Sequence, residues 1–68
     1  MAEGLGNRLR DLRAERELTQ AALAEMVGVS RKTINTVENG IFVPSAALAL
    51  KIARALERPV EEIFYLEA

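Results

Sequence analysis

The stretch TQAALAEMVGVSRKTINTVENG, from Thr19 to Gly40, decides the fold of this chain. Thr19 and Ser30 are residue types that cap helix N-termini, because a short side-chain oxygen accepts a backbone N–H of the first turn. Gly28 stands where the first helix must stop, since glycine adopts the left-handed conformation at low cost. The stretch therefore predicts two short helices joined by a very tight turn, over about residues 20–27 and 31–39.

Helix signals continue on both sides of this stretch. Upstream, Asn7 can open a helix, with Leu5, Leu9 and Leu12 as an apolar stripe at helical spacing. Downstream, Ser45 follows a proline and can cap a fourth helix. No segment shows sustained alternation of apolar and polar residues with β-branched enrichment, so we expect no sheet. The predicted fold class is all-α, a single domain over residues 1–68 with five helices at about residues 7–16, 20–27, 31–39, 46–56 and 60–66.

Composition excludes several classes of function. The chain has 68 residues, no cysteine and no histidine. A disulfide framework, a cysteine-based zinc site and any histidine-based catalytic or metal centre are therefore excluded. Both serines stand at predicted helix caps with no base nearby, so we expect no enzyme, no cofactor and no metal site. No apolar run reaches the roughly 18 residues of a membrane span and the start has no apolar signal core, so we expect a cytoplasmic protein.

The second helix of the pair has two chemically different faces. At about 100° per residue, Ile34 and Val37 point to one side of this helix. The polar side chains on the other side or its flank are Arg31, Lys32, Asn35, Thr36 and Asn39. Arginine and lysine can donate to guanine, asparagine can pair with adenine, and a threonine methyl can touch the thymine methyl. Two helices around a tight turn form the helix-turn-helix pattern, whose second helix enters the DNA major groove, so we expect this face to contact bases.

Charge is unevenly distributed along the chain. The formal net charge is −1, but residues 30–56 carry four cations against one anion, and residues 57–68 carry one cation against four anions. A basic region is a prerequisite for binding phosphate backbones. We expect phosphate contacts from Gln20, at the N-terminal end of the first helix of the pair, and from Asn39, at the C-terminal end of the second.

Glu38 falls on the flank of the second helix that faces the core. A carboxylate in that position requires a cation, because burial of an unpaired charge is costly. Arg13 stands one turn after Leu9, beside the apolar stripe of the first helix. We therefore expect a structural ion pair between Arg13 and Glu38.

Together these motifs resemble those of Cro/lambda-repressor-like (XRE family) helix-turn-helix domains. The matching segments, which cover roughly residues 5–65, are N7-R-L-R-D-L-R13, L18-T-Q20, L23-A24, G28-V-S30, I34, V37-E-N-G40, P44-S45, L48-A-L-K-I-A53 and E61-E-I-F64. The resemblance implies a compact five-helix bundle that binds a specific double-stranded operator, usually as a two-fold homodimer. Carried over by position, it implies base contacts from Arg31, Lys32 and Thr36, with Asn35 contributing, phosphate contacts from Gln20 and Asn39, and the Arg13–Glu38 ion pair.

Two segments depart from the family pattern. The loop Ile41-Phe42-Val43 is apolar, whereas many relatives carry basic residues there that touch phosphate. Phe42 either folds back onto the core or contacts a partner. The second departure is Glu57-Arg58-Pro59, which replaces the common Gly-x-Ser between the fourth and fifth helices. The usual glycine stop and serine cap are therefore missing at that boundary.

The sequence thus favours a dimeric, nucleoid-associated repressor of prokaryotic, phage or plasmid type. We expect Ile63 and Phe64 to close the core, and Tyr65 and Leu66 to be free for a dimer contact. An alternative is an antitoxin or restriction-control protein, for which the apolar loop and the acidic tail would supply the surface for a protein partner. A second alternative is an interaction module on the same fold that does not bind DNA, and the charges of Arg31 and Lys32 count against it.

Overall fold

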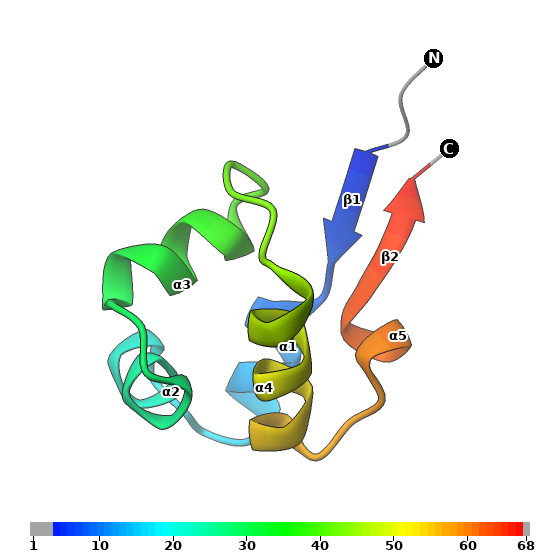
Figure 1. Ribbon diagram of the computed structural model, residues 1–68. Helices are drawn as coiled ribbons and strands as arrows, with labels where there is room; N and C mark the ends of the chain where they lie inside the picture. The colour runs from blue at the N-terminus through cyan, green and yellow to red at the C-terminus, as the bar shows by residue number, and fades with distance from the viewer. Residues whose placement is uncertain (1–3, 68) are drawn as a thin grey trace.

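The computed structural model describes residues 4–67, which form five helices and one two-stranded sheet (Figure 1). The elements in chain order are β1 (Gly4–Asn7), α1 (Leu9–Glu15), α2 (Gln20–Val27), α3 (Arg31–Glu38), α4 (Ala46–Leu56), α5 (Val60–Ile63) and β2 (Phe64–Glu67). The predicted five-helix fold class is confirmed. None of the described helices is long and apolar enough to cross a membrane, since the longest, α4, has 11 residues.

Three hydroxyl side chains begin three of the helices, as their positions in the sequence predict. The hydroxyl oxygens of Thr19, Ser30 and Ser45 each accept the backbone N–H three residues later, at 3.0, 3.2 and 3.1 Å. Each bond satisfies one of the N–H groups that a helix N-terminus leaves without a partner inside the helix. Gly28 ends α2 with a φ of 76°, in the left-handed region that favours glycine.

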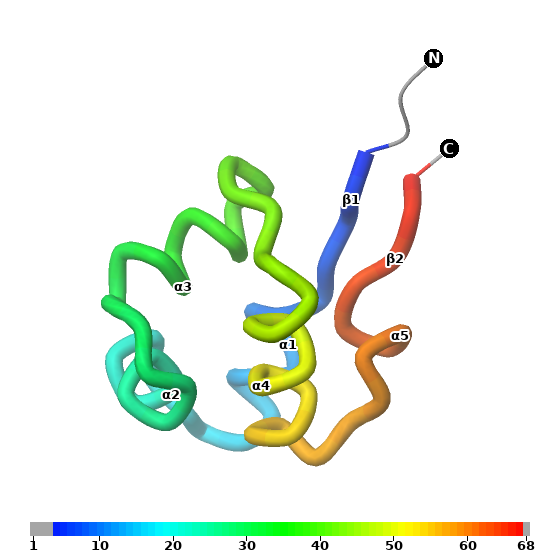
Figure 2. The backbone as a smooth tube through the Cα atoms, in the orientation of Figure 1, coloured from blue at the N-terminus to red at the C-terminus, as the bar shows by residue number. Residues whose placement is uncertain are grey.

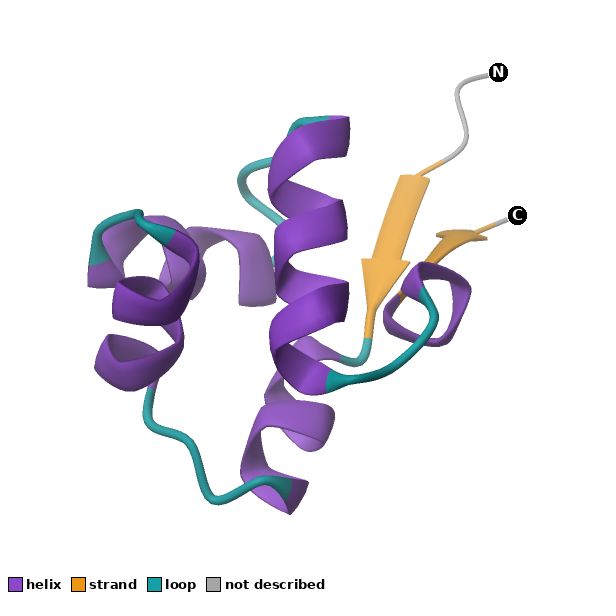
Figure 3. Ribbon diagram, turned by 60° about the horizontal axis from the view of Figure 1, so that its bottom comes forward, coloured by secondary structure: helices purple, strands orange, loops and turns teal. Residues whose placement is uncertain are grey.

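The core lies around α4, which stands between the α2–α3 pair on one side and α5 with the sheet on the other (Figure 3). Apolar side chains from every helix meet there. Those with less than 2% of their surface exposed are Leu9, Leu23, Ile34, Val37, Ile52, Leu56 and Ile63. Burying each such side chain contributes roughly 1.5–3 kcal/mol relative to leaving it in water. This shared core holds α2 and α3 in one orientation.

The two-stranded sheet contradicts the expectation that the chain contains no sheet. β1 and β2 lie at the two ends of the described chain and run antiparallel, with Leu5 opposite Leu66 and Gly6 opposite Tyr65 (Figure 2). Leu5 therefore belongs to a strand rather than to the apolar stripe of the first helix. Each strand has only four residues and pairs across nearly the whole chain length, so neither shows the local alternation by which a strand is recognised in sequence.

The first and last helices are shorter than the sequence predicts. α1 begins at Leu9 rather than at residue 7, because Asn7 is the last residue of β1. The Asn7 side chain still supports the helix start, since its Oδ1 accepts the Leu9 N–H at 3.1 Å. The last helix, α5, ends at Ile63 rather than at about residue 66, because the chain from Phe64 onward pairs with β1.

The boundary between α4 and α5 lacks the glycine and serine that the family pattern would place there. Glu57 ends α4 in the left-handed conformation, with a φ of 55°. Its carboxylate accepts a hydrogen bond of 2.8 Å from Arg16, on the loop after α1. Pro59 then precedes α5 without a side-chain cap. A non-glycine residue in this conformation costs about 1–2 kcal/mol.

Candidate nucleic-acid interface

The face of α3 that points away from the core carries exposed polar side chains. Ile34 and Val37 are buried, whereas Arg31, Lys32 and Asn35 are exposed. Within residues 4–67, none of these three exposed side chains takes part in an ion pair or a side-chain hydrogen bond. α3 thus presents two cations and one amide to the solvent on a rigid support.

Thr36 is less exposed than Arg31, Lys32 and Asn35, and its side chain is hydrogen-bonded within the protein. It is half-buried, and its hydroxyl donates a 2.9 Å hydrogen bond to the backbone carbonyl of Thr33. Its backbone carbonyl also accepts the N–H groups of Ile41 and Phe42, at 2.9 and 3.2 Å, which fold the following loop against the end of α3. The one hydroxyl hydrogen of Thr36 is therefore in use, which leaves its methyl group and the lone pairs of its hydroxyl oxygen for a DNA base.

Glu38 is the centre of a hydrogen-bonded cluster that joins α1, α2 and α3. Its side chain has no exposed surface. Arg13 Nε lies 2.7 Å from Glu38 Oε2, and Arg13 Nη2 lies 3.3 Å from Oε1. Gln20 Nε2 donates to Oε1 at 3.0 Å. The structure thus brings together the two residues that the sequence pairs, and adds Gln20 to them.

The partners of Glu38 control its ionisation. Burial by itself would raise the pKa of this carboxyl group, because it disfavours the charged form. The hydrogen bonds from Arg13 and Gln20, together with the positive charges of Arg13 and Arg10, outweigh burial and leave the pKa below its ordinary value. Glu38 is therefore a carboxylate at neutral pH, and its cluster holds the ends of α2 and α3 together by charge-assisted hydrogen bonds.

The two residues predicted to bind phosphate lie at helix ends, and each has one amide hydrogen in use. Gln20, the first residue of α2, donates to Glu38. Asn39, which follows α3, donates through Nδ2 to the Asn35 carbonyl at 2.8 Å. Since a side-chain amide carries two N–H hydrogens, each residue keeps one for a ligand. Gln20 and Arg31 also border one open hollow of about 500 Å³, which places a predicted phosphate residue beside a predicted base residue.

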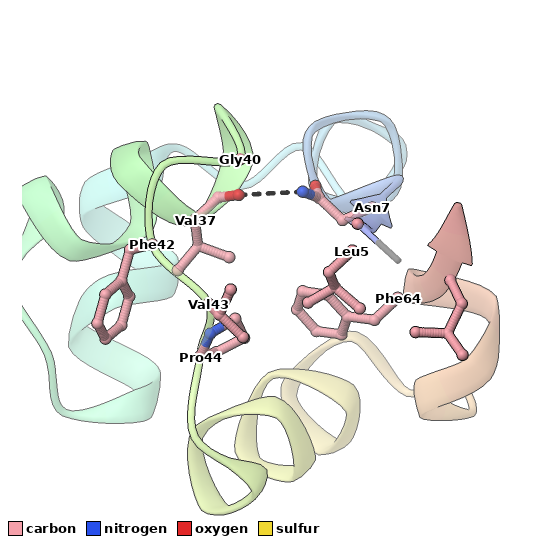
Figure 4. A pocket seen from close by; sticks show the side chains of 10 residues that line it. Leu5, Asn7, Val37, Gly40, Phe42, Val43, Pro44 and Phe64 are labelled. Carbon is pink, nitrogen blue, oxygen red and sulfur yellow. Dashed lines mark hydrogen bonds between the residues drawn. The ribbon is translucent and has the colours of Figure 1, made fainter. Parts of the chain in front are cut away.

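Two polar residues of this region were missed by sequence reasoning. Arg10 lies near Glu38, with its Nε 3.7 Å from Oε1, and its Nη2 donates to Asn39 Oδ1 at 3.2 Å. Asn7 donates through Nδ2 to the Val37 carbonyl at 3.0 Å and thereby ties β1 to α3 (Figure 4). The position of Arg10 near Glu38 can be predicted from the sequence. Residues three apart share one face of a helix, and Arg13, three residues later, is predicted to pair with Glu38.

A second, apolar hollow of about 450 Å³ lies between the sheet and the loop after α3 (Figure 4). Its apolar lining side chains are Leu5, Val37, Phe42, Val43, Pro44, Phe64 and Leu66. Phe42 is 47% exposed, so its side chain does not fold into the core. Ile63 and Phe64 are buried as expected, whereas Leu66 is 68% exposed.

Tyr65, the other candidate for a dimer contact, has an intramolecular role as well. It is 40% exposed, and its ring lies across Gly6 on the neighbouring strand. The guanidinium carbon of Arg8 sits 5.6 Å from the centre of the ring, at the distance of a cation–π contact. Leu66 is therefore the freer of the two side chains.

Among residues 4–67, no three acidic side chains come together as a metal site would require. The exposed side chains of Arg31, Lys32 and Asn35 on α3 are hydrogen-bond donors, and the carboxylate of Glu38 at the end of that helix is buried and neutralised by Arg13. Such an arrangement suits an anionic polymer that presents both phosphates and base edges.

Comparisons with known proteins point in the same direction. Residues 9–63 match the model of the helix-turn-helix family HTH_3. The chain is 44% identical over 61 residues to the uncharacterized HTH-type transcriptional regulator YgzD of Bacillus subtilis, covering 90% of this chain and 92% of that protein. The restriction-modification controller protein C.AhdI of Aeromonas hydrophila is 38% identical, with a TM-score of 0.77 over 81% of this chain and 83% of that one. The P22 c2 repressor, solved with a synthetic operator, is 33% identical, with a TM-score of 0.77 over 79% and 82%.

Proposed function

The chain belongs to the helix-turn-helix family and is a DNA-binding transcriptional regulator, and from this premise we propose that it is a dimeric repressor whose α3 binds in the major groove of a two-fold symmetric operator. The observation that carries the proposal is the exposed face of α3, on which Arg31, Lys32 and Asn35 have no partner within the described chain. The likeness to the operator-bound P22 c2 repressor supports it.

In this proposal the side chains of α3 contact base edges. Arg31 and Lys32 donate to guanine, whose N7 and O6 accept in the major groove, and Asn35 pairs with adenine. Thr36 offers its methyl group to a thymine methyl, and its hydroxyl cannot donate to a base while it donates to the Thr33 carbonyl. The groove is about 12 Å wide, so it admits one helix, and in this proposal that helix is α3.

Phosphate contacts hold α3 in register. Gln20 offers its second amide hydrogen at the N-terminal end of α2, where the backbone N–H groups and the helix dipole also favour an anion. Asn39 offers its second amide hydrogen at the opposite end of α3. Because these contacts do not depend on sequence, they set the orientation of α3 while the base contacts set specificity.

A homodimer would place two copies of α3 in successive major grooves, about 34 Å apart on one face of the DNA. Tyr65 and Leu66 are the proposed dimer contacts, and the exposure of Leu66 on β2 supports this assignment. The proposed location is the cytoplasm, in association with the nucleoid.

A second candidate function is an antitoxin or restriction-control regulator that also binds a protein partner. The exposed apolar loop of Ile41, Phe42 and Val43 favours this candidate, as does the likeness to the controller protein C.AhdI. Co-purification of the chain from its native host with one stoichiometric second protein would support it, and recovery of the chain alone would count against it.

The proposed function is tested by selection of bound duplexes from a random DNA pool. We expect enrichment of one sequence whose two halves are related by a two-fold axis, with half-sites about one helical turn apart. A pool that stays unenriched after repeated rounds would contradict sequence-specific binding. Enrichment of a single unrepeated half-site would contradict the dimer.

Two alanine variants separate base contacts from phosphate contacts on the selected duplex. Lys32→Ala should reduce discrimination against single-base changes in its half-site by roughly 1–3 kcal/mol, whereas Gln20→Ala should weaken binding to all sequences alike. Lys51→Ala on α4, an exposed lysine, is the matched control and should leave the base preference unchanged. Competition binding with a panel of mutated duplexes measures both quantities. A folded Lys32→Ala protein with full base preference would show that the site assignment is wrong.

A further inference from the structure

We propose that Arg10 contacts the DNA backbone, pairing with Asn39 to hold one phosphate at the C-terminal end of α3. This inference rests on the DNA binding proposed above and adds a residue to it. Sequence reasoning gave no role to Arg10, and the ion pair inside the protein does not require it. The reasons are its surplus charge, its exposure and its bond to Asn39.

The charge of Arg10 is not consumed by Glu38. Both oxygens of that carboxylate already accept hydrogen bonds, from Arg13 and Gln20, at 2.7 to 3.3 Å. Arg10 Nε lies 3.7 Å from Glu38 Oε1, which is beyond hydrogen-bond length. Arg10 and Arg13 thus lie beside a single carboxylate, so these three side chains together carry one positive charge. Arg10 is the more exposed of the two arginines, and the charge available to a ligand is therefore that of Arg10.

Arg10 lies at the C-terminal end of α3, where the helix dipole weakens the binding of a phosphate. The C-terminal end of a helix carries a partial negative charge, which repels an anion. Asn39 lies at that end of α3, so its amide alone would bind phosphate poorly. The side chain of Arg10 is 63% exposed and reaches this end, so its guanidinium places a positive charge beside the negative end of the helix.

The bond between the two side chains also orients Asn39. Arg10 Nη2 donates to Asn39 Oδ1, so the amide oxygen is turned toward α1 and the amide nitrogen toward the other side. One hydrogen of that nitrogen is bonded to the Asn35 carbonyl, and the second is free. The guanidinium and the free amide hydrogen are therefore adjacent donors that can bind oxygens of one phosphate.

An open polar hollow of about 380 Å³ adjoins this pair and leaves room for the ligand. Its charged lining residues are Arg8, Arg10, Asp11 and Glu38. Glu38 is neutralised by Arg13, so the carboxylate that opposes an incoming phosphate there is that of Asp11. Two guanidinium groups outweigh it, although that of Arg8 is drawn toward the ring of Tyr65.

The salt dependence of binding tests the proposal, because each phosphate contact releases condensed cations from the DNA. The probe is the duplex recovered by selection from the random pool, with a mixed-sequence duplex lacking that site as a second probe. For Arg10→Ala, the slope of log K against log salt concentration should become shallower by about 0.9 per protomer on both probes. Arg10→Lys, which keeps the charge, should retain most of the slope.

Arg54→Ala is the matched control. It removes the same charge from an exposed arginine near the C-terminal end of α4, which lies far from the C-terminal end of α3 in Figure 1. Its slope should equal that of the wild-type protein. Circular dichroism and thermal unfolding of all variants exclude loss of the fold as the cause of weaker binding.

Three results would overturn the proposal. A folded Arg10→Ala protein with the wild-type slope would show that Arg10 does not contact phosphate, while DNA binding itself would stand. An Arg10→Ala protein with altered base preference but an unchanged slope would show that Arg10 acts only through the position of α3. A selection that recovers no duplex, with a wild-type protein that also fails to bind the mixed-sequence duplex, would overturn the proposed function, and this inference with it.

Discussion

At the scale of single residues, Glu38 connects the helices that form the interface. It is a buried anion that joins three helices, and the interface residue Gln20 is one of its partners. Loss of its charge would leave Arg13 unpaired beside the core and would free the N-terminal end of α2 from the C-terminal end of α3. Removing one partner of a buried ion pair costs much more than an exposed pair contributes.

The lowered pKa of Glu38 makes the stability of the fold depend on pH. The ionised carboxylate is favoured in the folded state, so its contribution is complete above the ordinary pKa of glutamate and is lost as the pH falls through the lowered folded-state pKa. We expect the urea midpoint of unfolding to fall on acidification, and to fall less in Glu38→Gln. At neutral pH this variant should be less stable by roughly 3 kcal/mol.

Glu62→Gln is the control for this experiment, because Glu62 is an exposed carboxylate paired with Arg58. Its unfolding midpoint should follow the wild-type curve at every pH, since exposed ion pairs contribute little. Parallel pH curves for the wild-type protein and Glu38→Gln would show that Glu38 is not ionised differently in the folded and unfolded states.

Some side-chain contacts of individual residues can be predicted from the sequence, and others cannot. The contact between Arg13 and Glu38 follows from helical spacing and from the cost of a buried charge. The bond between Arg10 and Asn39 could not be derived in this way, because both side chains are exposed and nothing local requires them to meet. Burial makes a partner obligatory, and exposure leaves the choice to the tertiary arrangement.

At the scale of elements, the sheet is the feature that sequence patterns did not predict. Tyr65 packs on Gly6 across the two strands, where a side chain on the glycine would occupy the position of the aromatic ring. The absence of a side chain at Gly6 therefore allows the Tyr65 ring to pack directly on the backbone of β1.

Gly6→Ala tests this packing. The new Cβ would overlap the Tyr65 ring and displace it, with loss of its contacts on the strand and with Arg8, so we expect a loss of stability of about 1 kcal/mol. Gly4→Ala, on the same strand, is the matched control. Its Cβ would lie 3.2 Å from the flexible carboxylate of Glu67 and should cost little. Thermal unfolding compares the two, and equal melting temperatures would contradict the packing role of Gly6.

The end of α4 offers a second prediction at this scale. Glu57 adopts a left-handed conformation that costs a non-glycine residue about 1–2 kcal/mol, and glycine would avoid this cost but lose about 0.5–1 kcal/mol more conformational entropy on folding. Glu57→Gly should therefore stabilise the protein by about 0.5–1 kcal/mol, less the small contribution of the exposed pair with Arg16. Glu25→Gly, in an exposed position inside α2, should destabilise by about 1 kcal/mol. Urea unfolding measures both changes. A destabilised Glu57→Gly protein would show that the ion pair between Arg16 and Glu57 contributes more free energy than the left-handed conformation of Glu57 costs.

At the scale of the whole molecule, the sheet brings the two ends of the described chain together beside the loop after α3. This arrangement places Leu66 at the same apolar hollow as Val43 and Phe42. Figure 4 shows the last two on the loop after α3. The protein therefore has a polar surface over α3 and an apolar surface next to it. A contact made through Leu66, Val43 and Phe42 would use none of the exposed polar side chains of α3.

The proposed dimer predicts the effect of a charge on this apolar surface. Leu66→Asp should shift the protein toward the monomer and weaken operator binding, while leaving the melting temperature nearly unchanged, because the leucine is 68% exposed. Met26→Asp, an equally large exposed apolar residue on α2, is the control and should leave the assembly state unchanged. Sedimentation velocity measures the assembly state. An unchanged distribution for Leu66→Asp would remove this residue from the interface.

The sequence by itself determined where α2, α3 and α4 begin and which face of α3 is polar, because caps, glycine stops and helical periodicity act within a few residues of each other. Only the tertiary structure decided that the chain ends form a sheet, that α5 stops at Ile63 and that Arg10 meets Asn39. These contacts join residues that are far apart in the chain, and they are made by backbone groups or exposed side chains. Such groups can form hydrogen bonds in many different arrangements, so the local sequence does not select their partners. Their choice depends on how the core orients the helices.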